Sequence, residues 1–185
     1  TLGGNVAHAL PAADGTIALL ALNAVVEVAS ALGTRRVPFK ELFLGPGKSS
    51  LKHGEELLVG FYLLLSTPHQ ASCFKRIMRP QGVALPILNC AVWLEREADM
   101  IKDIRIAVGP GGGTPFRATQ AEDILCGKPF NAESFESAIE ALLAQAHFRT
   151  SARRASADYR QHIVIGLFKD VFDTAWERAR EISSF

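Results

Sequence analysis

A long amphipathic segment near the C-terminus places the strongest constraint on what this chain can fold into. Apolar residues recur at every fourth position from Tyr159 to Ala175, and a second apolar row from Val164 to Trp176 runs beside them. This spacing predicts one long helix over residues 155–182. The apolar stripe is wide enough that the helix must face a core.

Short strand-like segments occupy most of the chain before that helix. The expected strands cover residues 24–29, 35–39, 56–65, 73–79, 87–95, 101–108 and 115–118. The first two are expected to form a hairpin that turns at Gly33 and Thr34. Strands followed by helices indicate an α+β fold. A break at Pro68 divides the chain into two parts, residues 1–66 and 70–185.

The N-terminal part begins with segments that lack a strand pattern. Residues 1–14 are expected to form a loop, and an Ala- and Leu-rich run over residues 16–22 predicts a short helix. Asp14 stands where an N-cap residue would begin that helix, because its carboxylate can accept a hydrogen bond from the free N–H groups of the first turn. Residues 43–48 form a second expected loop, rich in glycine and proline.

Two further helices are predicted from their end signals. Thr119–Glu122 has the form of a capping box, in which each side chain bonds the backbone of the other residue. Gly127 is expected to end this helix, because glycine adopts positive φ without strain. The next helix is expected to begin at Asn131 or Ser134 and to run to about residue 146.

The charge pattern argues against partners that are bound through a strong field. The formal net charge is +1, and the basic pairs Arg35–Arg36 and Arg153–Arg154 are isolated in the sequence. A basic stripe for nucleic acid or an anionic lipid surface is therefore not expected. The longest apolar run, over residues 57–65, is too short to insert across a bilayer.

Cysteine and histidine usage argues against a metal centre or a nucleophilic site in this chain. Cys73, Cys90 and Cys126 are far apart and odd in number, which predicts a reducing, cytoplasmic compartment. There is no C-x-x-C, H-E-x-x-H or G-x-S-x-G motif for zinc, an iron–sulfur cluster or a serine nucleophile. We therefore predict no catalytic and no metal-binding residues, which favours a chain that holds a cofactor.

The opening motif Thr1-Leu2-Gly3-Gly4-Asn5 is the strongest ligand signal. Adjacent glycines allow positive φ, and successive N–H groups can then form a concave nest for phosphate. Thr1 and Asn5 add hydrogen-bonding side chains, and Asp14 follows nine residues after Asn5. The alternative is an ordinary glycine turn followed by an ordinary N-cap.

Two other features allow more than one interpretation. The glycine-rich segment Gly109–Gly113 could hold a phosphate, but no Lys-Ser/Thr follows it, which favours a sharp turn between strands. Lys75 lies on an apolar strand, where a lysine is usually an edge or surface residue. It would gain a functional role only if it faced a ligand.

The order of several motifs resembles the FAD-binding medium subunit of the molybdenum hydroxylases, the xanthine dehydrogenase and carbon monoxide dehydrogenase group. The N-terminal part carries T-L-G-G-N, P-A-A-D, G-T-R-R-V-P-F, F-L-G-P-G-K and E-E-L-L. The C-terminal part carries G-G-G-T-P-F-R-A, A-E-x-x-L-x-G-K-P and S-A-D-Y-R, which are similar to that subunit's C-terminal domain.

This resemblance implies both a fold and a role. Residues 1–66 would be the second half of a vanillyl-alcohol-oxidase-type FAD-binding domain, and residues 70–185 would be the C-terminal domain, a small antiparallel sheet with packed helices. The FAD of the family takes electrons from 2Fe–2S clusters on a partner subunit, which a molybdopterin subunit supplies. The flavin then passes them to NAD or another acceptor, so the chain would be an oxidoreductase component.

The resemblance also implies a set of FAD contacts. The T-L-G-G-N segment would lie against the pyrophosphate and ribityl group, Asp14 would hydrogen-bond the cofactor, and Leu58 and Lys75 would lie close to it. Within the T-L-G-G-N segment, the residues expected to contact FAD are Thr1, Gly3, Gly4 and Asn5.

The N-terminal half of the family's FAD domain is not found in this sequence, so we expect the chain alone to be inactive. Two alternatives stay open. One is a scaffold or interaction module of the same kind of complex without flavin, and the other is an unrelated phosphate-binding domain.

Overall fold

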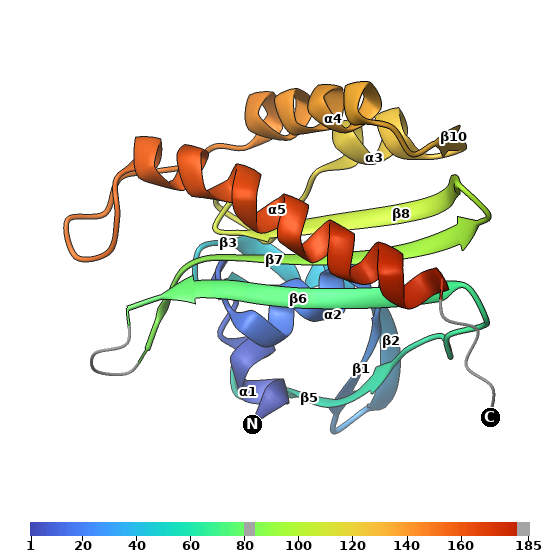
Figure 1. Ribbon diagram of the computed structural model, residues 1–185. Coiled ribbons are helices and arrows are strands. Elements are labelled where there is room, and N and C mark those ends of the chain that lie inside the picture. The colour runs from blue at the N-terminus through green and yellow to red at the C-terminus, as the bar shows by residue number, and fades with distance from the viewer. Residues whose placement is uncertain (80–83, 181–185) are drawn as a thin grey trace.

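The computed structural model describes residues 1–79 and 84–180, and a five-stranded antiparallel sheet organises them (Figure 1). The strand order is β10-β8-β7-β6, and β9 also pairs with β8. The strands are β6 (Gln70–Met78), β7 (Pro86–Glu97), β8 (Met100–Gly109), β9 (Phe116–Arg117) and β10 (Lys128–Pro129). The four strands predicted after Pro68 are confirmed. The segment Gly109–Gly113 connects β8 to β9, as its interpretation as a turn between strands requires.

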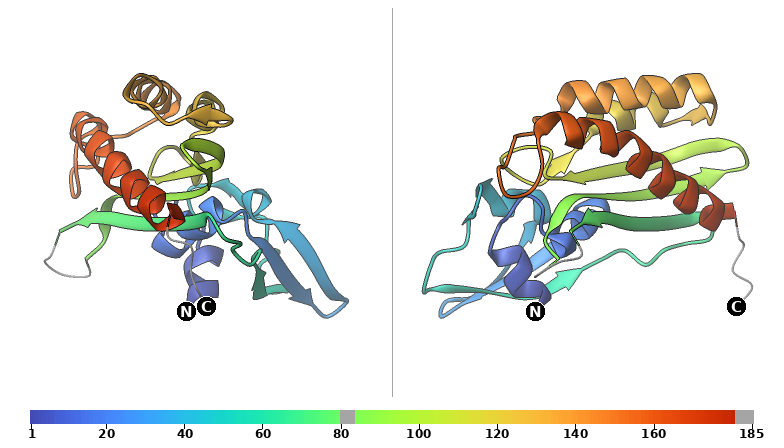
Figure 2. Two further views of the ribbon diagram at one scale, coloured as in Figure 1. Left: turned by 45° about the vertical axis from the view of Figure 1, so that its right-hand side comes forward. Right: turned by 60° about the vertical axis from the view of Figure 1, so that its left-hand side comes forward.

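Three helices cover one face of this sheet: α3 (Thr119–Leu125), α4 (Ala132–Gln145) and α5 (Ala157–Arg180) (Figures 1 and 2). α5 lies across β6 and β7, and α3 packs against α4 and β8. The core beneath them contains a cluster of five aromatic rings, with centroids 4.9–6.2 Å apart: Phe130, Phe135, Phe168, Phe172 and Trp176. The long amphipathic helix is thereby confirmed, while its predicted end at Ile182 lies outside the described residues.

The N-terminal third covers the opposite face. It contains α1 (Leu2–Ala7), α2 (Asp14–Ala21) and a sheet in the order β2-β1-β5, with α2 packed directly on β7 and β8. The strands of this sheet are β1 (Val25–Ser30), β2 (Gly33–Pro38) and β5 (Glu56–Tyr62). The predicted hairpin and the following strand are confirmed, and with them the α+β class.

The connection between β2 and β5 is more ordered than expected. A 3-10 turn, η1 (Phe39–Leu42), leads into the short hairpin formed by β3 (Phe43–Gly45) and β4 (Lys48–Ser49). The prediction of a plain loop at residues 43–48 is wrong in this respect. The sequence predicts a loop here because the hairpin turns tightly at Pro46-Gly47, where Gly47 has a φ of +67°.

β7 is buried on both of its faces. All nine residues from Pro86 to Leu94 are buried, which explains a nearly continuous apolar run in place of an alternating one. Ala91 on β7 and Ala107 on β8 belong to the same hydrophobic cluster as the N-terminal helices and strands. Each part has its own cluster, but the N-terminal one extends onto the larger sheet. The division into domains at residues 66–70 stays a prediction.

Two local predictions are wrong, and side-chain hydrogen bonds explain both. The expected loop over residues 1–14 contains α1, whose first turn is capped by Thr1 Oγ1 accepting from Gly4 N at 3.1 Å. The expected capping box at Thr119–Glu122 does not form, because Ala118 is the N-cap. The carboxylate of Glu122 instead accepts from Ile106 N at 2.7 Å and from Arg117 Nε at 2.6 Å.

Two end signals of the helices are confirmed. Gly127 follows α3 with a φ of +72°, the left-handed conformation expected of a helix-ending glycine. Asn131 is the N-cap of α4, and its Oδ1 accepts from Ser134 N at 2.8 Å. Both signals are local: the positive φ is a property of Gly127 itself, and Asn131 bonds a residue three positions away, which is why the sequence predicts them.

Candidate functional site

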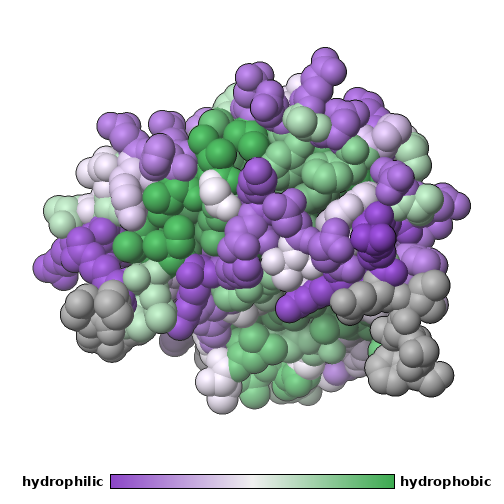
Figure 3. All heavy atoms as spheres, viewed as in Figure 1, coloured by the Kyte–Doolittle hydropathy of each residue, from purple (hydrophilic) through white to green (hydrophobic). Residues whose placement is uncertain are grey.

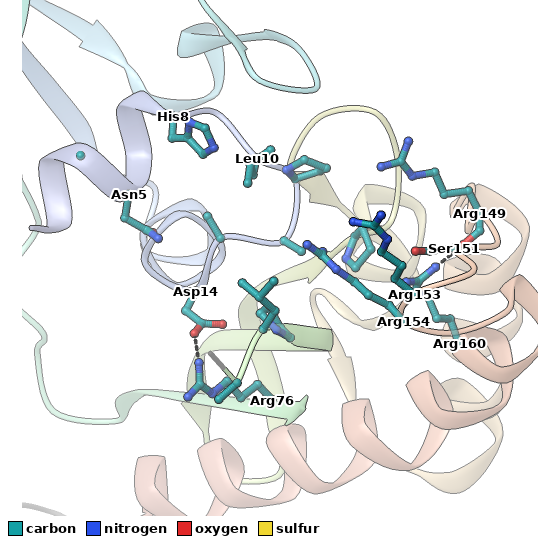
Figure 4. A pocket seen from close by; sticks show the side chains of 18 residues that line it. Asn5, His8, Leu10, Asp14, Arg76, Arg149, Ser151, Arg153, Arg154 and Arg160 are labelled. Carbon is teal, nitrogen blue, oxygen red and sulfur yellow. Dashed lines mark hydrogen bonds and ion pairs between the residues drawn. The ribbon is translucent and has the colours of Figure 1, made fainter. Parts of the chain in front are cut away.

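A cavity of about 600 Å³ lies where the N-terminal helices meet the start of β7 and the loop between α4 and α5 (Figure 4). The apolar part of its lining comes from three segments and consists of Leu10, Pro11, Ala12, Ala13, Ala84, Leu85, Pro86 and Pro110. Polar side chains occupy the two ends. Figure 4 shows Asn5 and Asp14 toward one end and a group of arginines toward the other.

Asp14 is held in place by two side chains from the larger sheet. Its Oδ1 accepts from Asn89 Nδ2 at 2.9 Å, and its Oδ2 forms an ion pair with Arg76. Arg76 and Asn89 face one another across β6 and β7, so both project toward Asp14 from the same face of the sheet. We refer to these three residues as the Asp14 end of the cavity.

Asp14 does not cap α2, contrary to the sequence prediction. Ala13 is the N-cap, Asp14 is the first helical residue, and no side chain caps this helix through its N-cap position. The carboxylate instead interacts with Asn89 and Arg76. The residue type and position of Asp14 predict an N-cap, but side chains on β6 and β7 bind both of its carboxylate oxygens.

Asn89 is a polar residue in the buried run of β7, and it is fully buried. Its Nδ2 donates to Ala12 O at 3.1 Å as well as to Asp14, so it fixes the loop before α2. Its Oδ1 has no partner among the described residues. Gly109 leaves room for it, since a Cβ there would lie 2.4 Å from that oxygen and 2.7 Å from Pro11 O.

The opening motif forms a helix rather than the predicted phosphate nest. Neither Gly3 nor Gly4 has positive φ, and the N–H of Gly4 donates to Thr1. Asn5 Oδ1 accepts from Gly15 N at 3.1 Å, which ties α1 to the start of α2. A Cβ on Gly15 would lie 2.5 Å from Leu2 Cδ1 and 3.0 Å from Asn5 Oδ1, so the two helices approach each other closely at this glycine. The nest geometry is therefore wrong.

The other end of the cavity is formed by Arg149, Arg153, Arg154 and Arg160, which we call the arginine cluster. Arg160 is the buried member: its Nε donates to Ile87 O at 3.0 Å, and its guanidinium also donates to Arg149 O. Burial lowers the pKa of Arg160, and the nearby charges of Arg154 and Arg149 lower that pKa further. In residues 1–79 and 84–180, no carboxylate lies within 4.0 Å of a cluster guanidinium.

The structure brings some of the predicted cofactor contacts together. Gly4, Asn5 and Asp14 line the cavity. Thr1 lies beside Gly4 as its capping residue, and a Cβ on Gly3 would lie 3.5 Å from the backbone oxygen of Leu58. Gly3 thus packs against the backbone of Leu58, while the Leu58 side chain is buried in the N-terminal core.

Lys75 is not brought to this cavity. Side chains alternate along β6, so Arg76 faces Asp14 while Lys75 faces α5. Lys75 Nζ forms an ion pair with Asp170 Oδ1 at 2.7 Å, beside a groove that includes His162 and Ile163. This face, seen in Figure 3, carries hydrophilic side chains interrupted by hydrophobic patches. The assignment of Lys75 to the cofactor rests on the resemblance alone.

Sequence reasoning missed the residues that complete the cavity. Arg76 is adjacent to Lys75, and Asn89 interrupts an apolar run, which is a usable signal for a buried polar contact. The pair Arg153–Arg154 was visible but isolated in the sequence. It joins Arg149 and Arg160 only because the loop before α5 folds back over the start of β7.

Two further observations limit the kinds of site within the described part of the chain. No group of three or more His, Cys, Asp or Glu side chains is arranged to hold a metal ion. No helix there combines the length and the apolar character needed to cross a membrane.

Two known families match this chain, one before residue 64 and the other after residue 71. Residues 1–63 match the FAD binding domain in molybdopterin dehydrogenase, and residues 72–175 match the CO dehydrogenase flavoprotein C-terminal domain. The second match alone spans more than half of the chain.

Individual relatives agree with both matches. The chain is 36% identical over 171 residues to the nicotine 6-hydroxylase medium subunit of Paenarthrobacter nicotinovorans, covering 91% of this chain and 58% of that protein. It is 31% identical over 176 residues to a xanthine dehydrogenase FAD-binding subunit of Escherichia coli, covering 95% and 60%. The chain thus spans about 60% of the length of these relatives.

A solved structure shows the same fold. The chain superposes on carbon monoxide dehydrogenase from Hydrogenophaga pseudoflava with a TM-score of 0.89 and 28% sequence identity. The match covers 96% of this chain and 61% of the other.

Proposed function

Because this chain belongs to the family of FAD-binding flavoprotein subunits of the molybdenum hydroxylases, we propose that its cavity holds part of an FAD cofactor. FAD would supply the redox chemistry, accepting electrons and passing them on. The observation that carries the proposal is that one cavity is lined by three of the residues that the resemblance assigns to FAD: Gly4, Asn5 and Asp14.

The residues present suit a flavin. A flat heteroaromatic ring has apolar faces and a polar edge, and this cavity combines apolar lining residues with polar ends. Its volume of about 600 Å³ lies in the ordinary range for small-molecule sites. Asp14 is oriented by Asn89 and Arg76 before any ligand arrives, and such preorganisation lowers the entropic cost of binding.

The role in a larger complex extends the proposal beyond this chain. The flavin would receive electrons from 2Fe–2S clusters of an iron–sulfur subunit, fed by a molybdopterin subunit, and would pass them to NAD or another acceptor. Support comes from the relatives, which are named as the FAD-binding and medium subunits of dehydrogenases and hydroxylases. This chain's part would be to place the flavin.

The contact between Asp14 and FAD is tested by titrating the chain with FAD and following flavin absorbance and fluorescence. Loss of one hydrogen bond to a charged group costs about 1.5–3 kcal/mol, so Asp14→Ala should weaken FAD binding roughly 10- to 150-fold. Asp123→Ala, which removes an exposed carboxylate on α3, is the matched control and should bind FAD as the unmodified chain does.

Equal FAD affinities for the Asp14→Ala and Asp123→Ala variants would contradict a flavin contact at Asp14. A chain that stays colourless at saturating FAD would contradict FAD binding by this chain, and would favour the alternative of a scaffold module without flavin.

A further inference from the structure

We propose that the arginine cluster is an anion site that binds a phosphate group. Arg149, Arg153 and Arg154 line the cavity, and none of their side chains hydrogen-bonds to a described residue or lies within 4.0 Å of a described carboxylate. Four guanidinium groups thus share one end of a cavity whose other end carries a carboxylate already paired with Arg76. No acidic side chain in the described part of the chain forms an ion pair with the arginine cluster.

The cluster is presented by a loop with its own network of hydrogen bonds. The loop begins where His147 N donates to Gly111 O at 2.8 Å, and it closes on itself where Ser151 N donates to Ala155 O at 2.9 Å. Arg79 donates to Arg154 O at 3.1 Å, which ties the loop to the end of β6. The backbone that carries Arg153 and Arg154 is therefore held by contacts that do not use the side chains of these two residues.

Arg160, the buried member of the cluster, is held in place by hydrogen bonds to the backbone. Arg160 is 2% exposed, and it donates to carbonyl groups on both sides, at Ile87 and at Arg149. Backbone carbonyls carry no net charge, so they satisfy its N–H groups without neutralising it. The same proximity that lowers the pKa of Arg160 is a repulsion that a bound anion would relieve.

The clustering is local rather than a consequence of a basic protein. The chain carries a formal net charge of only +1, with 20 basic and 19 acidic residues. Guanidinium groups present planar forks of N–H donors that match the oxygens of phosphate, and several of them together favour a doubly charged group. Phosphate or diphosphate is therefore the ligand chemistry that this end of the cavity fits.

Two sources of that phosphate are compatible with the cavity. One is the diphosphate of FAD itself, in which case the inference rests on the proposed function and places the diphosphate at the end of the cavity away from Asn5, contrary to the contact that the resemblance implies. The other is a second phosphorylated molecule that enters beside the flavin. The chemistry recognised by the cluster is the same in both cases, and the test separates them.

The test measures binding of inorganic pyrophosphate to the chain by isothermal titration calorimetry at low ionic strength. The variant carries Arg149→Gln, Arg153→Gln and Arg154→Gln, because these side chains make no hydrogen bond to the described fold. Charge-assisted hydrogen bonds of this kind predict about tenfold weaker binding for each guanidinium lost, so the triple variant should bind about 1000-fold more weakly.

A matched control separates a site from general attraction. Lys40→Gln, Lys48→Gln and Lys169→Gln together remove the same charge from exposed side chains outside the cavity. This variant should bind pyrophosphate within about twofold of the unmodified chain, apart from weak screening effects. Equal weakening in both triple variants, or no measurable binding to the unmodified chain, would overturn the proposal.

Repeating the titration with FAD present assigns the source. If saturating FAD abolishes pyrophosphate binding and riboflavin does not, the cluster binds the diphosphate of the flavin. If binding persists with FAD bound, a second phosphorylated ligand is the occupant. If FAD does not bind this chain but pyrophosphate binding still depends on the three arginines, the anion site stands and the proposed flavin site of this chain fails.

Discussion

The two ends of the cavity differ in how their charges are compensated. At the Asp14 end, the carboxylate has partners on both oxygens, one from Asn89 and one from Arg76. At the arginine cluster, three of the four guanidiniums have no side-chain partner among the described residues, and the fourth bonds only to carbonyls. One end is electrostatically complete in the chain, whereas the other is not.

This difference separates two ways in which a fold prepares a binding surface. A compensated carboxylate is fixed in direction, so it can position a ligand without changing its own state. An uncompensated cationic group lowers the stability of the empty protein slightly and gains most when an anion arrives. The comparison predicts that mutations of the residues that hold Asp14, Asn89 and Arg76, mainly change folding stability, whereas mutations at the exposed arginines mainly change binding.

The largest effect is expected for Asn89→Asp. This change places a carboxylate in a fully buried position against the carboxylate of Asp14, and it removes the donor to Ala12 O. An uncompensated buried charge costs about 3 kcal/mol or more, so the variant should unfold at much lower denaturant concentration at neutral pH. Urea unfolding followed by circular dichroism measures this loss.

The pH dependence of the Asn89→Asp variant gives a second test. Burial beside Asp14 would raise the folded-state pKa of the new carboxyl above its unfolded value, so the folded state binds more protons. The variant should therefore recover stability, relative to the unmodified chain, as the pH falls from about 8 to about 5. Gln161→Glu, an amide-to-acid change at an exposed site on α5, should show neither effect. A similar small loss in both variants would mean that Asn89 does not hold Asp14.

The Asp14 end also shows where reasoning from the sequence succeeds and where it stops. Strand alternation, the apolar run of β7 and the stripe of α5 depend on residues close in the chain, and all are confirmed by the structure. The partners of Asp14 lie 62 and 75 residues away in sequence. Spacing within a helix or strand carries no information about such contacts, which explains why a helix cap was predicted instead.

The same limit applies to the opening motif. Two adjacent glycines disfavour a helix by about 1 kcal/mol each, so an isolated T-L-G-G-N segment is better explained as a turn. The helix forms because Thr1 caps it and Asn5 bonds Gly15 N at the start of α2. The prediction of ligand-lining residues at Gly4, Asn5 and Asp14 was compatible with the cavity even though the predicted local geometry was not.

A smaller effect is expected for Arg76→Gln at the Asp14 end. The side chains of Arg76 and Asp14 are 35% and 31% exposed, so solvent screens much of their attraction. The free energy of unfolding should fall by about 0.5–1 kcal/mol in the Arg76→Gln variant. A double-mutant cycle with Asp14→Asn measures the coupling directly, because it removes the effects that each change has on its own.

The neighbouring ion pair on β6 is the control for that cycle. Lys75 and Asp170 are more exposed, at 38% and 58%, and within residues 1–79 and 84–180 no third side chain orients the carboxylate. Coupling in the cycle of Lys75→Gln with Asp170→Asn should be smaller than in the cycle of Arg76 with Asp14. Equal coupling energies would remove the distinction between a preoriented carboxylate and an ordinary surface pair.

The smallest effect concerns the stability of the empty chain when Arg149, Arg153 and Arg154 are all changed to Gln. Removing a surface ion pair usually lowers the stability of a protein. These guanidiniums differ, because they lie near the buried charge of Arg160 and no described carboxylate pairs with them. Their removal relieves repulsion, so unfolding in phosphate-free buffer should shift by less than about 0.5 kcal/mol, in the stabilising direction. Added pyrophosphate should stabilise the unmodified chain and leave the variant unchanged, since only a protein that binds the anion in its folded state gains from it. Destabilisation of the empty variant by more than about 1 kcal/mol would show that these arginines support the fold, and would make the two ends of the cavity alike.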